Sequence, residues 1–135
     1  MISCFFFHQE TNPKYYFTDN GILNLFLLDG NTSLLENLVA INLLHKYGRS
    51  DAVFFYNKGI EVDFYIPDDS TAIQVCYNLD KSDGTFDREV NALLKLPNIL
   101  ECKKLLIITR DTERVLNIDN KIIEVIPVWK WLLGF

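Results

Sequence analysis

The sequence has few of the residues that build metal clusters or disulfide frameworks. Its three cysteines, Cys4, Cys76 and Cys102, include no close C-x-x-C pair, and its two histidines, His8 and His45, are far apart. An odd number of widely spaced cysteines predicts neither a disulfide framework nor a zinc site of the His/Cys type. It is typical of a protein kept in a reducing compartment.

Positive charge is also scarce. The chain has 13 lysines and arginines against 18 aspartates and glutamates, which gives a formal net charge of −5. Binding to phosphate backbones without regard to sequence needs a broad basic face, so this balance argues against it. The densest basic group is better explained as the solvated rim of a strand than as a DNA contact. Its members are Lys103, Lys104, Arg110 and Arg114.

Long apolar runs and nucleotide-binding motifs are missing as well. The apolar stretch Ile22–Leu28 is far too short to span a bilayer. The N-terminus has no positively charged segment followed by a small-residue cleavage site. Nothing matches the phosphate-loop pattern G-x-x-x-x-G-K followed by Ser or Thr, so ATP hydrolysis cannot be assigned to these residues. These absences predict a cytoplasmic protein with no membrane partner.

The chain does contain enough apolar residues for a sizeable core. Hydrophobic residues make up 49% of it and charged residues 23%, which favours a folded domain over a disordered segment. A length of 135 residues fits one domain. Within that domain we expect N-terminal strands and a short helix over residues 1–32, an α/β core over 33–109, and a C-terminal strand with a docking helix over 110–135.

Helical patterns occur in four places. Ser33 and Glu36 have the spacing of a capping box, and the apolar positions after them predict a mostly buried helix that ends near Gly48. A later helix is expected to stop before Pro97, because proline cannot continue a helix. The expected helices are 22–28, 33–47, 86–94 and 128–133.

Strand patterns alternate with these helices. The Asn57–Ile60 connection is short enough for a hairpin, and the apolar run Leu105–Thr109 is typical of a strand buried on both faces. From residue 33 to 109 the order is helix, strand, strand, strand, helix, strand, which predicts an α/β fold with a mixed sheet flanked by helices. The expected strands are Cys4–Phe7, Lys14–Thr18, Ala52–Tyr56, Glu61–Ile66, Ala72–Tyr77, Leu105–Thr109 and Ile122–Ile126.

Polar residues fall at particular places in this order. Glu36 lies on the first core helix, Asp63 on the second core strand, and Gln74 on the third, two residues before Cys76. Because side chains alternate along a strand, Asp63 and Gln74 can face one cleft. The arrangement resembles the restriction-endonuclease-like fold of the PD-(D/E)XK nucleases, where acidic residues and a Glu-x-Lys motif converge on magnesium. The resemblance implies Glu36, Asp63 and Gln74 as candidate catalytic residues and metal ligands, with DNA as the substrate.

Six short segments occur together in a characteristic order and spacing. They are Lys14–Ile22, Leu34–Val39, Gly59–Phe64, Ile73–Tyr77, Leu106–Asp111 and Pro127–Leu133. Through them most of the chain resembles the C-terminal domain of unknown function of bacterial and archaeal AAA-type ATPases. The resemblance implies that ATP binds only to an N-terminal domain absent from this chain, and that the partner is that domain or a second protomer.

Two positions depart from the nuclease pattern. Gln74 offers a neutral amide where the motif prefers a carboxylate, and Cys76 stands where the motif has lysine. Magnesium-assisted hydrolysis needs anionic oxygens around the ion and a group that activates water, so both losses fall at the reacting centre. Lys58 would lie about 16 Å along the strand from Asp63, beyond reach of a side chain. Arg88 on the next helix is a poor proton acceptor.

Each candidate also has a purely structural interpretation. Glu36 can be the capping-box partner of Ser33, worth about 1 kcal/mol to the helix. Asp63 can form a structural hydrogen bond to a helix end or to Gln74, because an unpaired carboxylate in a central strand would be costly. Cys76 is expected to pack as a small hydrophobe.

The favoured hypothesis is therefore a non-catalytic or weakly active nuclease-like module, which binds a partner, a substrate or a sister protomer while an ATPase half does the work. The alternative is a magnesium-dependent PD-(D/E)XK nuclease with Asp63 as its principal ligand. A third interpretation is a plain dimerisation domain. Phe5–Phe7, Trp129 and Trp131 place apolar aromatic surface at both ends of the chain, which would dock on the ATPase half or on a second copy.

Overall fold

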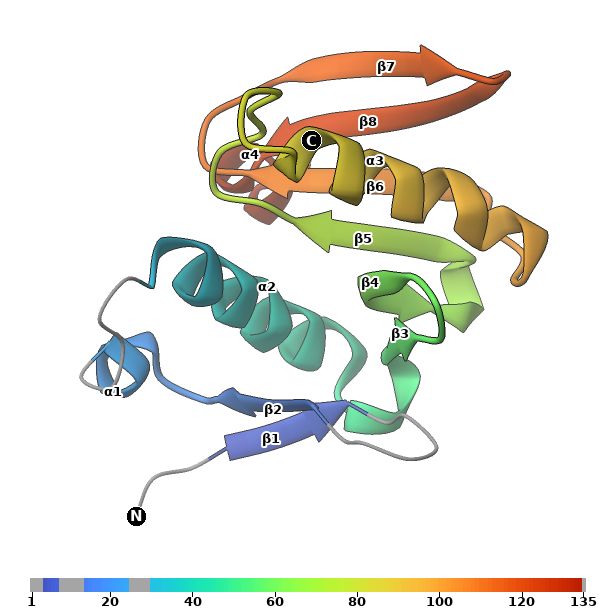
Figure 1. The fold of residues 1–135 in the computed structure, drawn as a ribbon. Helices are drawn as coiled ribbons and strands as arrows, with labels where there is room; N and C mark the ends of the chain where they lie inside the picture. Colours follow the sequence, from blue (N-terminus) through green and yellow to red (C-terminus); the bar gives the residue numbers. More distant parts are fainter. Residues whose placement is uncertain (1–3, 8–13, 25–29, 135) are drawn as a thin grey trace.

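The computed structural model describes residues 4–7, 14–24 and 30–134. A six-stranded sheet forms the centre of the molecule (Figure 1). Strand β5 is parallel to β6 and β6 to β8, whereas the other neighbours are antiparallel, so the expected mixed sheet is confirmed. In spatial order the strands are β3 (Phe54–Asn57), β4 (Glu61–Ile66), β5 (Thr71–Val75), β6 (Lys104–Thr109), β8 (Lys121–Pro127) and β7 (Arg114–Ile118).

Helices cover both faces of this sheet, in the expected core order of helix, three strands, helix and strand. α2 (Asn31–Tyr47) and α4 (Val128–Leu132) pack on one face, and α3 (Thr85–Lys95) packs on the other. Short 3-10 helices join some of these elements, at Ser50–Ala52, Pro67–Asp69 and Leu96–Asn98. Among the helices of the described residues, none has both the length and the apolar character that a membrane span requires.

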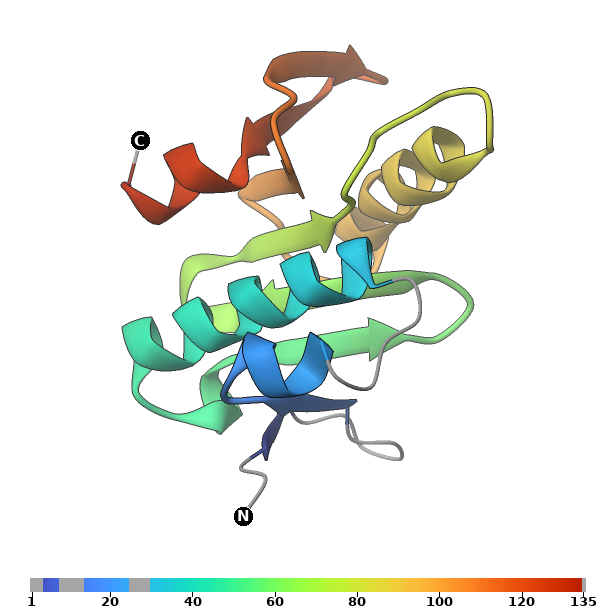
Figure 2. The ribbon, with the colours of Figure 1, turned by 90° about the vertical axis from the view of Figure 1, so that its left-hand side faces the viewer.

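The N-terminal segment forms a small unit of its own beside α2. β1 (Cys4–Phe7) and β2 (Lys14–Phe17) pair antiparallel and are not part of the six-stranded sheet. α1 (Asn20–Asn24) follows, and the rest of the helix expected over 22–28 lies outside the described residues. Figure 2 shows α2 across the strands of the main sheet, with this unit next to it. β2 is thereby brought close to the first core strands.

The expected capping box at the start of α2 is wrong. The helix begins two residues before Ser33, and its N-cap is Gly30, with no side-chain hydrogen bond to the cap. Ser33 therefore lies inside the first turn, and Glu36 is free to point away from its own helix end. The other end is as expected, because Gly48 adopts φ 69° and ends the helix in the left-handed conformation that glycine tolerates best.

Strand β7 has no counterpart among the expected elements. Its five residues are exposed or half-buried, so the apolar alternation that marks a strand is weak. β7 pairs with β8 through a two-residue turn, in which Asp119 and Asn120 have φ values of 52° and 61°. Two positive φ values are typical of the tight hairpin turns that Asp and Asn tolerate, and this Asp-Asn pair was the available signal.

Candidate functional site

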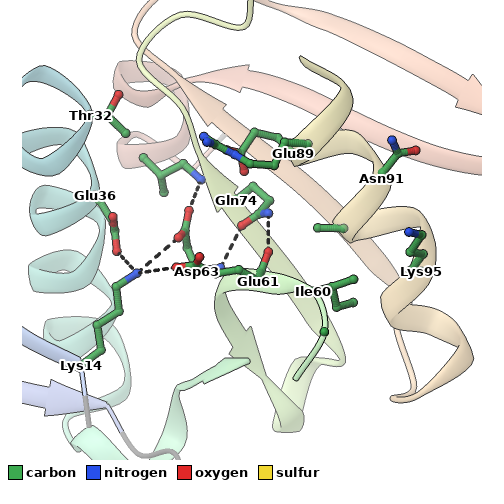
Figure 3. Close-up of a pocket in the computed structure, with 14 residues that line it drawn as sticks. Lys14, Thr32, Glu36, Ile60, Glu61, Asp63, Gln74, Glu89, Asn91 and Lys95 are labelled. Atoms are coloured by element: carbon green, nitrogen blue, oxygen red, sulfur yellow. Dashed lines mark hydrogen bonds and ion pairs between the residues drawn. The ribbon is translucent and has the colours of Figure 1, made fainter. Parts of the chain in front are cut away.

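A cavity of about 510 Å³ opens between α2 and α3, over β4 and β5 (Figure 3). Glu36 of α2, Asp63 of β4 and Gln74 of β5 all line it, so the three candidates from the sequence lie together. This convergence makes the cavity the candidate site. The other charged and polar lining residues are Lys14, Thr32, Glu61, Arg88, Glu89, Asn91 and Lys95.

A bulge in β4 marks the place where Asp63 enters the cavity. The pairing of β3 with β4 shifts by one residue, so that Asp63 and Phe64 together lie opposite Phe55. An extra residue reverses the alternation of side chains along a strand. Val62 accordingly packs on the α3 side of the sheet and Phe64 on the α2 side, although even alternation predicts that they share a face. That prediction is wrong because it assumes an unbroken strand.

The ammonium group of Lys14 lies among the carboxylates of the cavity, as Figure 3 shows. Its Nζ is 2.5 Å from Glu36 Oε1 and 3.4 Å from Asp63 Oδ1, and Glu61 Oε1 is 3.9 Å away. The ring centre of Phe55 lies 5.0 Å from the same nitrogen. Burial acts to lower the pKa of Lys14, but the carboxylates of Asp63 and Glu36 outweigh it and raise that pKa, so the amine stays charged.

Glu36 is held by β2 and not by its own helix. Its Oε1 accepts a hydrogen bond of 2.9 Å from the hydroxyl of Tyr16. The next residue, Asn37, is 2% exposed. Its side chain forms two hydrogen bonds of 2.8 Å with the backbone of Phe17, accepting one from the amide N–H and donating one to the carbonyl oxygen. Two consecutive α2 residues thus attach β2 to the core. The interpretation of Glu36 as a capping residue is wrong.

Gln74 uses both ends of its amide to hold the backbone of β4. Its Oε1 accepts a hydrogen bond of 2.8 Å from the N–H of Asp63, and its Nε2 donates one of 2.8 Å to the carbonyl oxygen of Glu61. The regular pairing of β4 with β5 stops at Phe64, so Gln74 bridges the strands where they separate. A carboxylate at this position could not donate to Glu61. The glutamine that departs from the nuclease motif is therefore the residue that this backbone arrangement needs.

The carboxylate of Asp63 also bridges the two strands, because it extends from β4 to the backbone of β5. Its Oδ2 accepts a hydrogen bond of 2.8 Å from the N–H of Val75. Burial, followed by the nearby carboxylate of Glu36, raises the pKa of Asp63 to about 7, although Lys14 and the Val75 hydrogen bond act in the opposite direction. Asp63 thus titrates near neutral pH.

On the opposite wall, Arg88 does not replace the missing lysine. Its Nε and Nη2 lie 3.0 and 2.7 Å from Glu89 Oε1, so its guanidinium is paired on its own helix. Cys76 donates a hydrogen bond of 2.8 Å to the carbonyl oxygen of Asn78, and burial raises the pKa of its thiol to about 11. A buried thiol with a raised pKa has little thiolate character, which agrees with the packing role expected for Cys76.

These contacts do not fit a magnesium ion. Over residues 4–7, 14–24 and 30–134, no group of three or more His, Cys, Asp or Glu side chains is placed to hold a metal. Lys14 lies between Glu36 and Asp63, and the amide oxygen of Gln74 is bonded to backbone. A hard cation needs several oxygens turned toward one point. The candidate ligands lie together, but as parts of a network centred on a lysine.

Lys14 is the site residue that sequence reasoning did not find. It lies 49 positions from Asp63, whereas the substitutes considered from sequence, Lys58 and Arg88, were chosen for their nearness to the core strands. A signal exists, because Lys14 and Tyr16 alternate along β2 and therefore share a face. Which partner that face meets depends on how β2 docks against α2, and local pattern carries no information about that.

Comparison with known proteins finds a relative of unknown function. No family model and no solved structure matches the chain. The chain is similar to the uncharacterized protein MJ1544 of Methanocaldococcus jannaschii, with 36% identity over 115 residues. The match covers 76% of this chain and 25% of the relative, so the chain spans about a quarter of the length of the curated protein that it matches.

Proposed function

We propose that this chain is a nuclease-like accessory domain without catalytic activity, the C-terminal domain of an AAA-type ATP-binding protein. In that role it binds a partner or substrate of the ATPase, or a second copy of itself, in the cytoplasm. The observation that carries the proposal is the position of Lys14. Its ammonium group lies between Glu36 and Asp63, where a nuclease of this class would hold its metal ion.

The order of the core elements supports a restriction-endonuclease-like fold. A helix, an antiparallel run of three strands, a second helix and a parallel strand follow one another from α2 to β6. Glu36, Asp63 and Gln74 lie in one cavity on this frame. A nuclease ancestry would explain why polar residues converge there although the network they form is structural.

The charges in the cavity argue against hydrolysis of a nucleic acid. Metal-assisted cleavage needs a cation to stabilise the phosphate and a group to activate water. Here the carboxylates outnumber the cations, so the cavity offers no positive field to a phosphate backbone. The carboxylates are Glu36, Glu61, Asp63 and Glu89, and the cations are Lys14, Arg88 and Lys95.

Four of the six segments that carry the resemblance to the ATPase domain meet in the lysine-centred network. Lys14 and Tyr16 contact Glu36, Lys14 contacts Asp63, and Asp63 is bonded to Val75. A network of four separate segments supports a shared module architecture. The match to a quarter of a longer relative supports a module that works within a larger protein.

A cleavage assay tests the absence of catalysis. The purified chain and its Asp63→Ala variant are incubated with linear and circular DNA in Mg²⁺ or Mn²⁺. We expect neither to cut DNA faster than buffer alone. Cleavage by the wild type that Asp63→Ala abolishes would overturn the proposal and support the alternative, a magnesium-dependent PD-(D/E)XK nuclease acting on DNA.

The reading frame upstream of Met1 tests the ATPase connection. We expect it to encode a phosphate-loop ATPase domain, and the two parts to purify together when expressed as separate chains. An upstream frame without that motif, together with a stable dimer of the chain in sedimentation, would favour the dimerisation domain instead.

A further inference from the structure

β7 lies at one edge of the six-stranded sheet, although its side chains are those of an inner strand. We propose that this edge is an interface between two copies of the chain. Their β7 strands pair antiparallel across a twofold axis and join the two sheets into one. The inference deepens the proposed function and rests on it, because it selects a second copy of the chain as the partner and assigns the surface that binds it.

Both faces of β7 carry apolar side chains, and neither face is fully covered. Leu116 and Ile118 face the α3 side, where they pack against the core but remain half-buried. Val115 faces the opposite side of the sheet, because side chains alternate along a strand, and it is 68% exposed. Apolar residues on both faces are typical of a strand inside a sheet, with a neighbouring strand on each side. Within the described residues, β7 has β8 on one side only (Figure 1).

The free edge of β7 also directs backbone groups away from the sheet. Alternate residues of an edge strand turn their N–H and C=O groups outward. In a two-residue hairpin the pair that flanks the turn is hydrogen-bonded, and here that pair is Ile118 and Lys121. Counting back from this pair, Val115 and Asn117 are the outward-directed residues of β7, and both are exposed. Their backbone groups can therefore form a ladder with a further strand.

The two edges of the sheet differ in their protection. At the opposite edge, β3 pairs through a register shift, and the 3-10 helix just before it packs against β1. β7 contains no proline and pairs with β8 in an unbroken register. Its one charged residue, Arg114, lies at the end of the strand and donates a hydrogen bond to the carbonyl oxygen of Leu79 in its own chain. Bulges, prolines and charges are the usual means of preventing edge pairing, so β7 is the open edge.

This difference between the edges favours a closed dimer. Pairing of β7 with β3 of the next copy would continue into a filament, whereas pairing of β7 with itself closes after two chains. An antiparallel pair centred on Leu116 uses all five residues of β7. Leu116 then lies opposite its counterpart on the α3 side, and Val115 lies opposite Asn117 on the other face.

The same register covers apolar side chains on both faces of the strand. On the α3 side, the pair of Leu116 side chains closes the half-buried edge of the core. On the other face, the two Val115 side chains become diagonal neighbours. Ile122, which is 58% exposed and diagonal to Val115 in its own sheet, extends this contact in each copy. Self-pairing thus removes from water apolar surface that the single chain exposes.

Sedimentation of the full chain over a range of concentrations tests the interface. Asn117→Pro removes an outward N–H, and Val115→Lys places two ammonium groups diagonally across the axis. We expect each substitution to raise the dissociation constant of the dimer at least about tenfold. Ile99→Lys is the matched control, because Ile99 is 52% exposed, lies outside the sheet and receives the same charge. It should leave the dissociation constant unchanged.

Amide hydrogen exchange locates the contact. The N–H groups of Val115 and Asn117 should exchange more slowly as the wild type is concentrated, whereas that of Leu116, which is directed at β8, should change little. Circular dichroism in urea checks that each variant is folded, and if Asn117→Pro is not, Val115→Lys and the exchange rates decide.

Two results would overturn the proposal. One is a wild type that stays monomeric up to about 1 mM, and the other is a dimer that neither β7 substitution weakens. DNA cleavage by the wild type that Asp63→Ala abolishes would instead overturn the proposed function, so the two failures are distinguishable.

Discussion

At the scale of single residues, the role of each side chain in the cavity follows from the hydrogen bonds that its residue type can form. Gln74 is a departure from a catalytic motif, yet its amide makes two backbone hydrogen bonds that need both a donor and an acceptor. Asp63 keeps the residue type of the motif, and its carboxylate serves the backbone of β5 and the ammonium group of Lys14. The side chains that suggest chemistry in the sequence hold two strands together where their ladder ends.

Gln74→Ala should destabilise the fold. It leaves the N–H of Asp63 and the carbonyl oxygen of Glu61 without their buried partner, and we expect a loss of about 2–3 kcal/mol in the free energy of unfolding. Urea denaturation measures it. Asn91→Ala, at an exposed position lining the same cavity, is the matched control and should change stability by less than about 0.5 kcal/mol. Equal effects of the two substitutions would contradict the bridging role of Gln74.

The titration of Asp63 predicts a pH dependence with a definite sign. Its pKa is about 7 in the folded protein and 3.8 as the ordinary value, so between these the folded state binds the proton more strongly than the unfolded state does. Stability should therefore fall as pH rises from about 4 to about 7. Urea unfolding of the wild type and Asp63→Asn across this range isolates the effect, because asparagine cannot titrate. Parallel pH profiles for the two chains would refute the assignment.

At the scale of elements, side-chain hydrogen bonds join β2 to α2, and apolar packing alone would leave β2 loosely attached. β2 belongs to a two-stranded unit outside the main sheet, and consecutive side chains of α2, Glu36 and Asn37, hold it. Asn37 also donates a hydrogen bond of 2.8 Å to the side chain of Asn20, which begins α1. The position of Lys14 in the cavity depends on this attachment, because Lys14 opens β2.

Asn37→Ala should release β2 from α2 without unfolding the sheet. We expect a loss of about 2–3 kcal/mol in stability, because the part-buried N–H and carbonyl oxygen of Phe17 lose their hydrogen bonds to the Asn37 side chain. The N–H of Phe17 should exchange with solvent faster, whereas amides of β6 keep their protection. Asn42→Ala, half-buried on the same helix, is the control. Unchanged exchange at Phe17 would show that apolar contacts suffice to hold β2.

The two tryptophans of α4 should differ in their importance for folding. Trp131 packs against the core on the α2 side, whereas Trp129 is 55% exposed. We expect Trp131→Ala to lower the free energy of unfolding by about 3 kcal/mol and Trp129→Ala to change it by less than about 0.5 kcal/mol. Thermal denaturation of both variants provides the comparison. Similar losses would mean that Trp129 is buried in solution, for example by a second copy of the chain.

At the scale of the whole molecule, one sheet connects two cores. β6 contributes to both, with Leu106 and Ile108 on the α2 side and Leu105 and Ile107 on the α3 side. Loss of either core would therefore expose one face of the central strand. A sheet that has lost one of its covering layers is not stable in water, so the two cores should unfold together.

Unfolding should accordingly follow one transition. Tryptophan fluorescence reports on α4 and the α2 side, since both tryptophans lie in that helix, and far-ultraviolet circular dichroism reports on the whole chain. We expect the two urea curves to coincide, with or without EDTA, because Lys14 and not a metal balances the half-buried carboxylates of Glu36 and Asp63. Separate midpoints would show that the layers fold independently, and a shift with EDTA would reveal a bound cation.

Much of this fold could be predicted from local pattern. The apolar run that becomes β6, the hairpin between β3 and β4, and the glycine that ends α2 each depend on residues close together in the chain. Strand β7 escaped prediction because its residues are at best half-buried and its apolar signal is weak. The capping box at Ser33 was a plausible local pattern that tertiary contacts overrode, because Glu36 gains a charged partner from β2.

The sequence by itself determined most of the elements and the mixed α/β sheet that they form. Those outcomes follow from periodicity and chain order, whereas the expectation that Glu36, Asp63 and Gln74 share a cavity came from the resemblance to the nuclease fold. Only the tertiary structure decided what the cavity contains. The β4 bulge and the docking of β2 bring Lys14 to the two carboxylates, and both depend on contacts between residues far apart in the chain. Lys14 lies 49 positions from Asp63, so the pattern of residues around Asp63 carries no information about this charged partner.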